Sequence, residues 1–391
     1  MEEFLNKVDP YLYQIVNTCE EKKEVSCIIY AHDYLRVKSF FENTPYCKNL
    51  IEYPFIRAFG LSIIKNKIPL LAQNESIQYI TASTKVFAQI NIAKKVTHIE
   101  KLNKNGYLGK NVTIAIIDTG ILPHLDFVSP NNRIVLFKDF VKKRKKAYDD
   151  NGHGTFVSGI AAGSGLISGS KYMGVAPKSN IISLKTLDEN GETTAFNILE
   201  AMQWVYDNHI KYNIKVVCMS FGSNPMSGRD PLSMGAEALW GQGITVVAAA
   251  GNSGPEHSSI KSPGISSRII TVGALDDKRN ENGIFQKKNF DVADFSSRGP
   301  AFRFLKPDLL APGVNLTSTS HKPKEFYTKL SGTSVATPII AGLSCLLIEK
   351  YPNITPDIIK GLLIKNAYPI VNDKNAEGYG LIDAEHLFDY D

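Results

Sequence analysis

Five apolar runs separated by helical stretches constrain the fold of this chain more than any other feature. The runs lie near residues 111–117, 181–186, 215–221, 244–250 and 269–274, and the helical stretches lie near 153–162, 194–209, 232–242 and 334–350. Continuous runs rich in Val and Ile indicate strands buried on both faces, and strands that alternate with helices form parallel sheets. The sequence therefore predicts an α/β fold of three layers with a mostly parallel sheet, over residues 91–391.

A different pattern precedes this region and predicts a small α+β domain over residues 1–90. Strands are expected near 25–30, 49–53, 56–63 and 77–82, and helices near 33–42 and 67–73. Their order is β-α-β-β-α-β, which is the order of ferredoxin-like modules.

Three polar residues stand at the ends of expected elements in the order Asp, His, Ser. Asp118 ends a β-branched run, His153 opens a helical stretch between two glycines, and Ser334 heads an apolar helix in the segment GTSVATP. A serine hydroxyl is a poor nucleophile at neutral pH, so it needs a base to take its proton and a third group to orient that base. We assign Ser334 as nucleophile, His153 as general base and then acid, and Asp118 as the orienting carboxylate.

A fourth polar residue, Asn252, follows the apolar run 244–250 and stands at the carboxyl end of the expected strand. Its amide can donate to an oxyanion that develops during acyl transfer. Taken singly, each of these four residues is more often a cap or turn residue. Their occurrence together and in this order favours the catalytic interpretation.

The chain resembles the subtilisin-like serine proteases, or subtilases, and is most similar to the intracellular bacterial type with an N-terminal propeptide. Besides the segments above, the resemblance takes in FSSRGP at 295–300, KPDLLAPG at 306–313 and GYGLIDA at 378–384. It implies a subtilisin-like fold and a serine endopeptidase of class EC 3.4.21 that acts through an acyl-enzyme intermediate. Two positions depart from the family pattern: Phe156 stands where His is usual, and Val335 where Met is usual.

The resemblance also implies how a peptide substrate binds. The backbone of Ser220, Phe221 and Gly222 would pair with an extended peptide as an added strand. The pocket for the side chain before the scissile bond would be lined by Ala249, Ala250 and Gly251. Main-chain pairing is indifferent to side chains, so a broad specificity with an apolar or aromatic preference is expected.

The N-terminal domain corresponds by position to a subtilase propeptide, a module that assists folding and then inhibits the enzyme. Residues 84–90 would lie along the cleft, and self-cleavage is expected between Phe87 and Asn91. An unrelated N-terminal domain is the alternative interpretation. A dormant or inhibitor-bound subtilase that acts as a regulatory or binding protein is the alternative function. An α/β-hydrolase esterase is disfavoured because it uses Gly-x-Ser-x-Gly and the order Ser, Asp, His.

Calcium is the usual structural ion of the family, and no cofactor is needed for the chemistry. Loop residues that offer candidate oxygen ligands are Asp126, Asp188, Glu189, Asn190 and Glu192. Their spacing matches no calcium loop of defined pattern, so the sequence assigns no metal site.

Composition bears on partners and location. The formal net charge of +5 over 391 residues is small and no recognition motif occurs, which argues against a nucleic-acid partner. The basic run KKRKK at 142–146 is interpreted as a solvated loop, with a localisation signal or a processing site as the alternatives. No signal peptide and no apolar run of about eighteen residues is found, so we expect neither secretion through a signal peptide nor a membrane span. Export by a route without a signal peptide is the alternative that the sequence leaves open. The five cysteines are an odd number, which does not indicate a disulfide framework. We therefore expect a cytoplasmic enzyme, and its partners are expected to be protein or peptide substrates.

Overall fold

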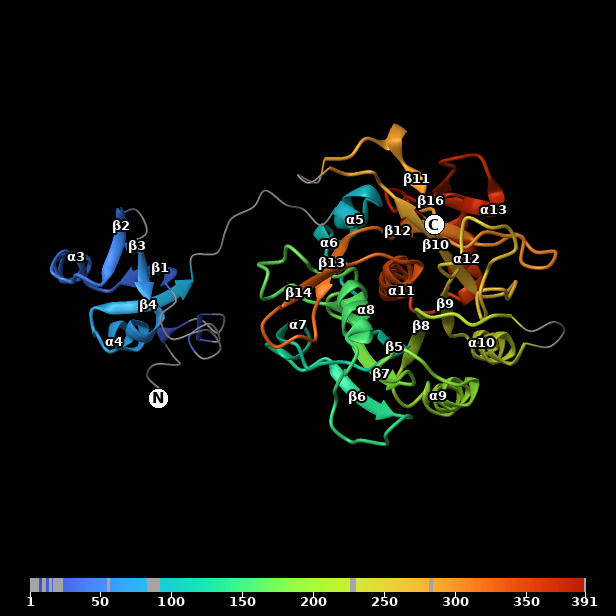
Figure 1. Ribbon diagram of the computed structural model, residues 1–391, viewed down its shortest axis with the longest axis horizontal. Helices are drawn as coiled ribbons and strands as arrows, with labels where there is room; N and C mark the ends of the chain where they lie inside the picture. The colour runs from blue at the N-terminus through green and yellow to red at the C-terminus, as the bar shows by residue number, and fades with distance from the viewer. Residues whose placement is uncertain are drawn as a thin grey trace. The chain divides into compact units, whose positions relative to one another are not determined.

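The computed structural model divides the chain into two compact units, Met1–Ala88 and Gln89–Asp391 (Figure 1). We call them the N-terminal unit and the C-terminal unit. The structure describes residues 24–54, 57–82, 92–225, 230–280 and 284–389, together with Lys7, Val8, Leu12, Tyr13 and Val16.

The N-terminal unit contains a four-stranded antiparallel sheet in the order β2-β3-β1-β4. Its elements are β1 (Glu24–Ala31), α3 (Tyr34–Glu42), β2 (Cys47–Tyr53), β3 (Ala58–Ile64), η2 (Lys65–Lys67), α4 (Ile68–Ala72) and β4 (Ile77–Ala82). The predicted β-α-β-β-α-β order is therefore confirmed.

One apolar layer holds this sheet against its helices. Cys27 and Ile29 of β1 point into the layer because alternate residues of a strand face the same side. Phe41 of α3 meets them there and packs edge to face on Phe59 of β3, with ring centroids 5.4 Å apart. The unit thus has a hydrophobic core of its own.

The C-terminal unit is built on a sheet in the order β15-β16-β12-β10-β9-β8-β5-β7-β6, with β11 paired to β10. The strands from β16 to β6 run parallel to one another, whereas β15 and β11 run antiparallel to their neighbours. The five predicted strands are β5 (Thr113–Asp118), β7 (Asn180–Lys185), β8 (Ile214–Met219), β9 (Thr245–Ala249) and β10 (Ile270–Asp276). The others are β6 (Ile134–Asp139), β11 (Asp291–Val292), β12 (Leu309–Pro312), β15 (Ala367–Tyr368) and β16 (Leu381–Ile382), and β13 (Leu316–Thr319) forms a separate hairpin with β14 (Tyr327–Leu330).

Helices cover both faces of this sheet (Figure 1). Every residue of β5 and β9 is therefore buried. Helices α8 (His153–Ala162) and α11 (Thr333–Lys350) pack together in one layer, and α9 (Ala195–Asn208) and α10 (Pro231–Gly241) pack together in another. The prediction of a three-layer α/β fold is confirmed. The remaining helices are α5 (Ile92–Val96), α6 (Ile99–Lys104), α7 (Leu125–Val128), η3 (Lys287–Asn289), α12 (Pro356–Lys365) and α13 (Lys374–Glu377).

Helix α11 is the central core helix of the C-terminal unit. It is long and apolar enough to cross a membrane, but 83% of it is buried inside the protein. Pro338 lies within it, and the helix nonetheless runs unbroken from Thr333. Proline lacks the N–H that would bond back to the Ser334 carbonyl. The fixed φ of proline is itself helical, so the helix loses a hydrogen bond without having to end.

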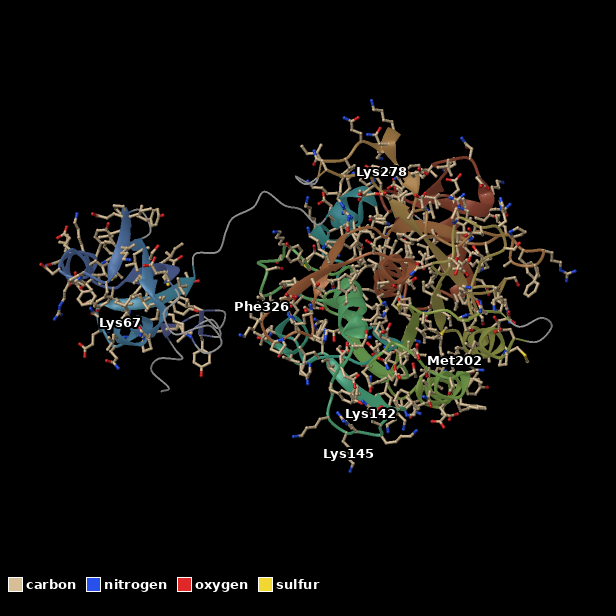
Figure 2. The ribbon with its side chains drawn as sticks, in the orientation of Figure 1. Lys67, Lys142, Lys145, Met202, Lys278 and Phe326 are labelled. Carbon is tan, nitrogen blue, oxygen red and sulfur yellow. The ribbon has the colours of Figure 1, made fainter. Side chains whose placement is uncertain are left out.

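The basic loop 142–146 follows β6 and is exposed throughout, as expected for a solvated loop. Lys145 extends outward from it in Figure 2. Lys142 forms ion pairs of 3.0 Å with Asp150 and 2.8 Å with Glu189. Part of the positive charge of this loop is therefore balanced by neighbouring carboxylates.

Candidate active site

Asp118, His153 and Ser334 come from three separate elements. Asp118 is the last residue of β5, His153 is the first of α8, and Ser334 is the second of α11. His153 and Ser334 line one cavity of about 580 Å³, and Asp118 lies buried with 1% of its surface exposed. Ligand sites of open α/β sheets lie at the carboxyl ends of the strands, where these residues are found.

The Asp118 carboxylate is hydrogen-bonded to the His153 ring. Its Oδ1 lies 2.8 Å from Nδ1 of the imidazole and also accepts the Thr119 N–H at 2.7 Å. The second oxygen, Oδ2, is buried and has no partner among the residues that the structure describes. A proton held on Nδ1 by Asp118 leaves Nε2 as the ring atom that can accept a proton.

Opposing effects set the pKa of His153. Burial lowers the pKa because it penalises the charged ring, whereas the carboxylates of Asp118 and Asp149 raise it. The attraction prevails, so the pKa of His153 lies above the ordinary value of 6.5. The site therefore stabilises an imidazolium at this position.

Asp149 is a buried carboxylate that the sequence analysis did not single out. Its Oδ1 accepts the Gly152 N–H at 2.7 Å and the Thr119 hydroxyl at 2.9 Å. Its Oδ2 accepts the N–H and the hydroxyl of Thr155, at 2.8 Å and 2.6 Å. Asp149 thus ties the first turn of α8, and with it His153, to the end of β5. An Asp a few residues before a helix is the signal for such a cap.

Asn252 is held by the residue that precedes the nucleophile. Its Oδ1 accepts both the N–H and the hydroxyl of Thr333, each at 2.9 Å. Because Oδ1 receives these two donors, Nδ2 must be the amide atom on the opposite side. A methyl group placed on Gly332 would lie 3.3 Å from Nδ2 and 2.9 Å from the Ser334 Oγ. The amide and the hydroxyl therefore border the same small space.

The cavity contains most of the residues predicted to bind substrate. Ser220, Phe221, Gly222, Ala249 and Gly251 line it together with Asn252.

Ala250 does not line the cavity. Because neighbouring residues of an extended segment face opposite sides, Ala250 points away from it and packs in a small buried cluster with Ile260, Ile265 and Ala301. Further lining residues that the sequence analysis missed are Thr119, Asn151, Leu187, Asn190, Gly191, Ser253, Lys261, Leu330, Ser331 and Thr333.

The two departures from the family pattern lie outside the cavity lining. Phe156 and Val335 are both buried in the main core of the C-terminal unit, where they are 0% and 1% exposed. Their side chains therefore affect core packing and do not touch a substrate in the cavity.

The candidate calcium ligands do not converge on a common ion site. Asp126 is buried, and its oxygens accept the Tyr327 hydroxyl at 2.8 Å and the Ile167 N–H at 3.2 Å. Asp188 Oδ1 accepts the N–H groups of Asn190 and Glu192, both at 2.9 Å. Glu189 is paired to Lys142. Among the described residues, the Asp and Glu candidates form no cluster of three ligand atoms close enough to share one ion.

His98, Asp383 and Glu385 bring three ligand atoms within 4.8 Å of one another. The His98 ring lies 2.6 Å from Asp383, and Lys101 pairs with Glu385. The three side chains thus have protein partners, through the His98–Asp383 contact and the Lys101–Glu385 ion pair.

Comparison with known proteins gives consistent matches. A family model described as the subtilase family matches residues 109–380. Serine protease AprX of Bacillus subtilis (strain 168) is 39% identical over 346 residues, which cover 81% of this chain and 75% of that protein. Subtilisin DY of Bacillus licheniformis is 34% identical over 289 residues, or 73% of this chain and 94% of that protein. The solved structure of the S41 psychrophilic protease, 29% identical, superposes with a TM-score of 0.62 over 77% of this chain and 100% of that one.

Proposed function

This chain belongs to the subtilase family and is a serine endopeptidase, and we propose that Asp118, His153 and Ser334 form its catalytic triad. The observation that carries this assignment is the 2.8 Å hydrogen bond between Asp118 and His153 beside a cavity that His153 shares with Ser334 and Asn252. Replacing Ser334 by Ala should abolish cleavage of a protein substrate and labelling by a fluorophosphonate. Labelling that persists in this variant would reject Ser334 as the nucleophile.

Acylation follows from this geometry. The Ser334 Oγ attacks the scissile carbonyl carbon while Nε2 of His153 takes the hydroxyl proton. The carbonyl π electrons move to oxygen, and the oxyanion accepts hydrogen bonds from the Asn252 amide and the Ser334 N–H. The latter belongs to the first turn of α11, whose N–H groups have no partner within a helix. Collapse of the intermediate breaks the C–N bond, and His153 gives its proton to the leaving amine.

Deacylation repeats these steps with water. Nε2 of His153 takes a proton from the water, whose oxygen attacks the ester carbonyl. The Ser334 oxygen then leaves and recovers the proton from His153. Asp118 stabilises the imidazolium through its hydrogen bond to Nδ1 in both halves of the reaction.

A broad specificity along the substrate is the second part of the proposal. Ser220, Phe221 and Gly222 directly follow the last residue of β8, so their backbone is positioned to continue the sheet onto an extended peptide. Such pairing uses main-chain groups that every residue carries. Digestion of an unfolded protein into many fragments without a common sequence away from the cleaved bond would support it.

The N-terminal unit is proposed to be a propeptide that the enzyme removes by self-cleavage. Its sheet order and its place before the protease unit support this role. The segment expected to lie along the cleft, 84–90, and the expected cleavage region from Phe87 to Asn91 lie outside the described residues. Intact mass and N-terminal sequencing of wild-type and Ser334→Ala protein, purified side by side, test the proposal.

Loss of the first ninety or so residues from wild type alone would support self-processing. If both proteins stay whole, the unit is a retained inhibitor or no propeptide, and the regulatory alternative gains weight. The cytoplasmic location stays a prediction, which cell fractionation with an antibody against the chain would test.

A further inference from the structure

Lys261 brings a positive charge into the cavity. Its side chain lines the cavity together with Gly222, of the segment proposed to pair with the substrate backbone, and Gly251, of the segment expected to line the pocket for the residue before the scissile bond. We call these two segments the pocket walls. No Asp or Glu is among the described residues that line this cavity. The charge of Lys261 is therefore not balanced by a carboxylate in the lining.

The backbone around Lys261 is fixed to both of these segments. The Lys261 N–H donates to the Ala250 carbonyl at 2.8 Å. The next residue, Ser262, exchanges two backbone hydrogen bonds of 2.9 Å and 3.0 Å with Ser223. The side chain thus starts from a rigid position between the two pocket walls.

The aliphatic stem of Lys261 fills the space between the two glycines. A Cβ added to Gly222 would lie 2.5 Å from the Lys261 Cβ, and one added to Gly251 would lie 2.4 Å from its Cγ. Contacts this short are not tolerated, so the stem passes close to the bare backbone of both walls. It occupies space in the pocket that a large aromatic side chain would otherwise use.

The ammonium group keeps donors for a ligand. Its Nζ lies 2.6 Å from the Asn224 Oδ1, and Lys261 forms no ion pair with any described carboxylate. A lysine ammonium has three N–H donors, and Asn224 takes one of them. A substrate carboxylate can accept the others, and charged partners make the stronger hydrogen bonds.

We infer that Lys261 determines specificity by selecting an acidic side chain, Glu or Asp, at the residue before the scissile bond. This inference rests on the proposed function and replaces the apolar or aromatic preference expected from the sequence at that one position. A basic side chain there is repelled by the same charge. Positions bound through main-chain pairing keep their broad acceptance.

The test compares two peptides that differ only by Glu or Gln before the scissile bond, which have nearly the same size and shape. In enzyme prepared from the full-length chain, the ratio of the two kcat/KM values does not depend on the fraction of active enzyme. Since a hydrogen bond to a charged group contributes about 1.5–3 kcal/mol, wild type should prefer Glu by about tenfold or more. The ratio should fall with increasing salt.

Two variants isolate the charge. Lys261→Met keeps the length of the stem and should bring the Glu/Gln ratio close to one. Asn224→Asp keeps Lys261 and places a carboxylate beside its ammonium, so it should also abolish the preference. A wild-type ratio near one, or a ratio that both variants leave unchanged, would overturn the inference.

Fluorophosphonate labelling of the same preparations separates this outcome from failure of the proposed function. The reagent reacts with an activated serine and has no side chain for the pocket. Labelling at Ser334 without a preference for Glu rejects only the role of Lys261. Absence of labelling in wild-type protein that has lost the N-terminal unit rejects the triad, and the inference with it.

Discussion

Thr333 holds Asn252 through two hydrogen bonds to one oxygen, from its N–H and from its hydroxyl, each of 2.9 Å. The same hydroxyl accepts the Gly251 N–H at 3.1 Å, so it connects the segment before Asn252 to the start of α11. Orientation of the amide therefore depends on the residue immediately before the nucleophile. Thr333 is a positioning residue for the oxyanion donor.

Thr333→Val should lower kcat by about fivefold and change KM little, because it removes the neutral hydroxyl hydrogen bond to Asn252, worth about 1 kcal/mol, and keeps the shape of the side chain. Asn252→Leu should lower kcat by about 10²–10³, a magnitude known from subtilisin, a member of the same family. Steady-state kinetics on a small ester substrate measures both. An unchanged kcat in Thr333→Val would show that the N–H of residue 333 alone is enough to orient the amide.

The activity should depend on pH through His153. Only the neutral ring can take the Ser334 proton, so kcat/KM should rise with pH through the pKa of His153 in the free enzyme. Because Asp118 and Asp149 outweigh burial and raise that pKa, the midpoint should lie above 6.5.

Asp118→Asn should move this midpoint to lower pH, because the attraction that favours the charged ring is lost and burial remains. It should also lower kcat by about 10⁴, because an amide at this position favours the wrong ring tautomer of His153. A midpoint that does not move would contradict the electrostatic role of Asp118.

The strands of the main sheet could be predicted where the chain carries long β-branched runs, as in β5 and β9. The strands β11, β15 and β16 have two residues each, and two residues carry no periodicity. Their pairing is decided by segments distant in sequence, as when Leu381 of β16 pairs with Leu310 of β12. Local pattern alone therefore could not find them.

Some residues of the site could likewise be predicted from the sequence, and others could not. Asp118, His153, Ser334 and Asn252 could be found because each stands at the end of a recognisable element. Lys261 was missed because it reaches the cavity through the pairing of its neighbour Ser262 with Ser223, which the local sequence does not indicate. Ala250 was predicted to line the pocket because the sequence does not show which residues of this extended segment face the cavity.

Asp149→Asn should destabilise the C-terminal unit by about 2–4 kcal/mol, because it turns an acceptor of buried N–H groups partly into a donor and leaves some of them unpaired. Asp149 is 6% exposed, so water cannot replace the lost partner. Denaturant unfolding in the Ser334→Ala background avoids self-digestion. Since Asp149 also raises the pKa of His153, the midpoint of the pH profile should move down in the active enzyme.

Gly332→Ala should reduce kcat by more than about 10², which corresponds to about 2.7 kcal/mol of lost transition-state stabilisation. The added methyl would lie 2.9 Å from the Ser334 Oγ and 3.3 Å from the Asn252 Nδ2, where the oxyanion must form. The backbone, at φ 156° and ψ 161°, is also in a region that essentially only glycine occupies. Gly361→Ala is the matched control, because a Cβ there meets nothing within 4 Å and alanine favours a helix such as α12. It should leave kcat unchanged and stabilise the protein by up to about 1 kcal/mol. If Gly332→Ala keeps wild-type kcat, the space beside Ser334 and Asn252 is not where the oxyanion is bound.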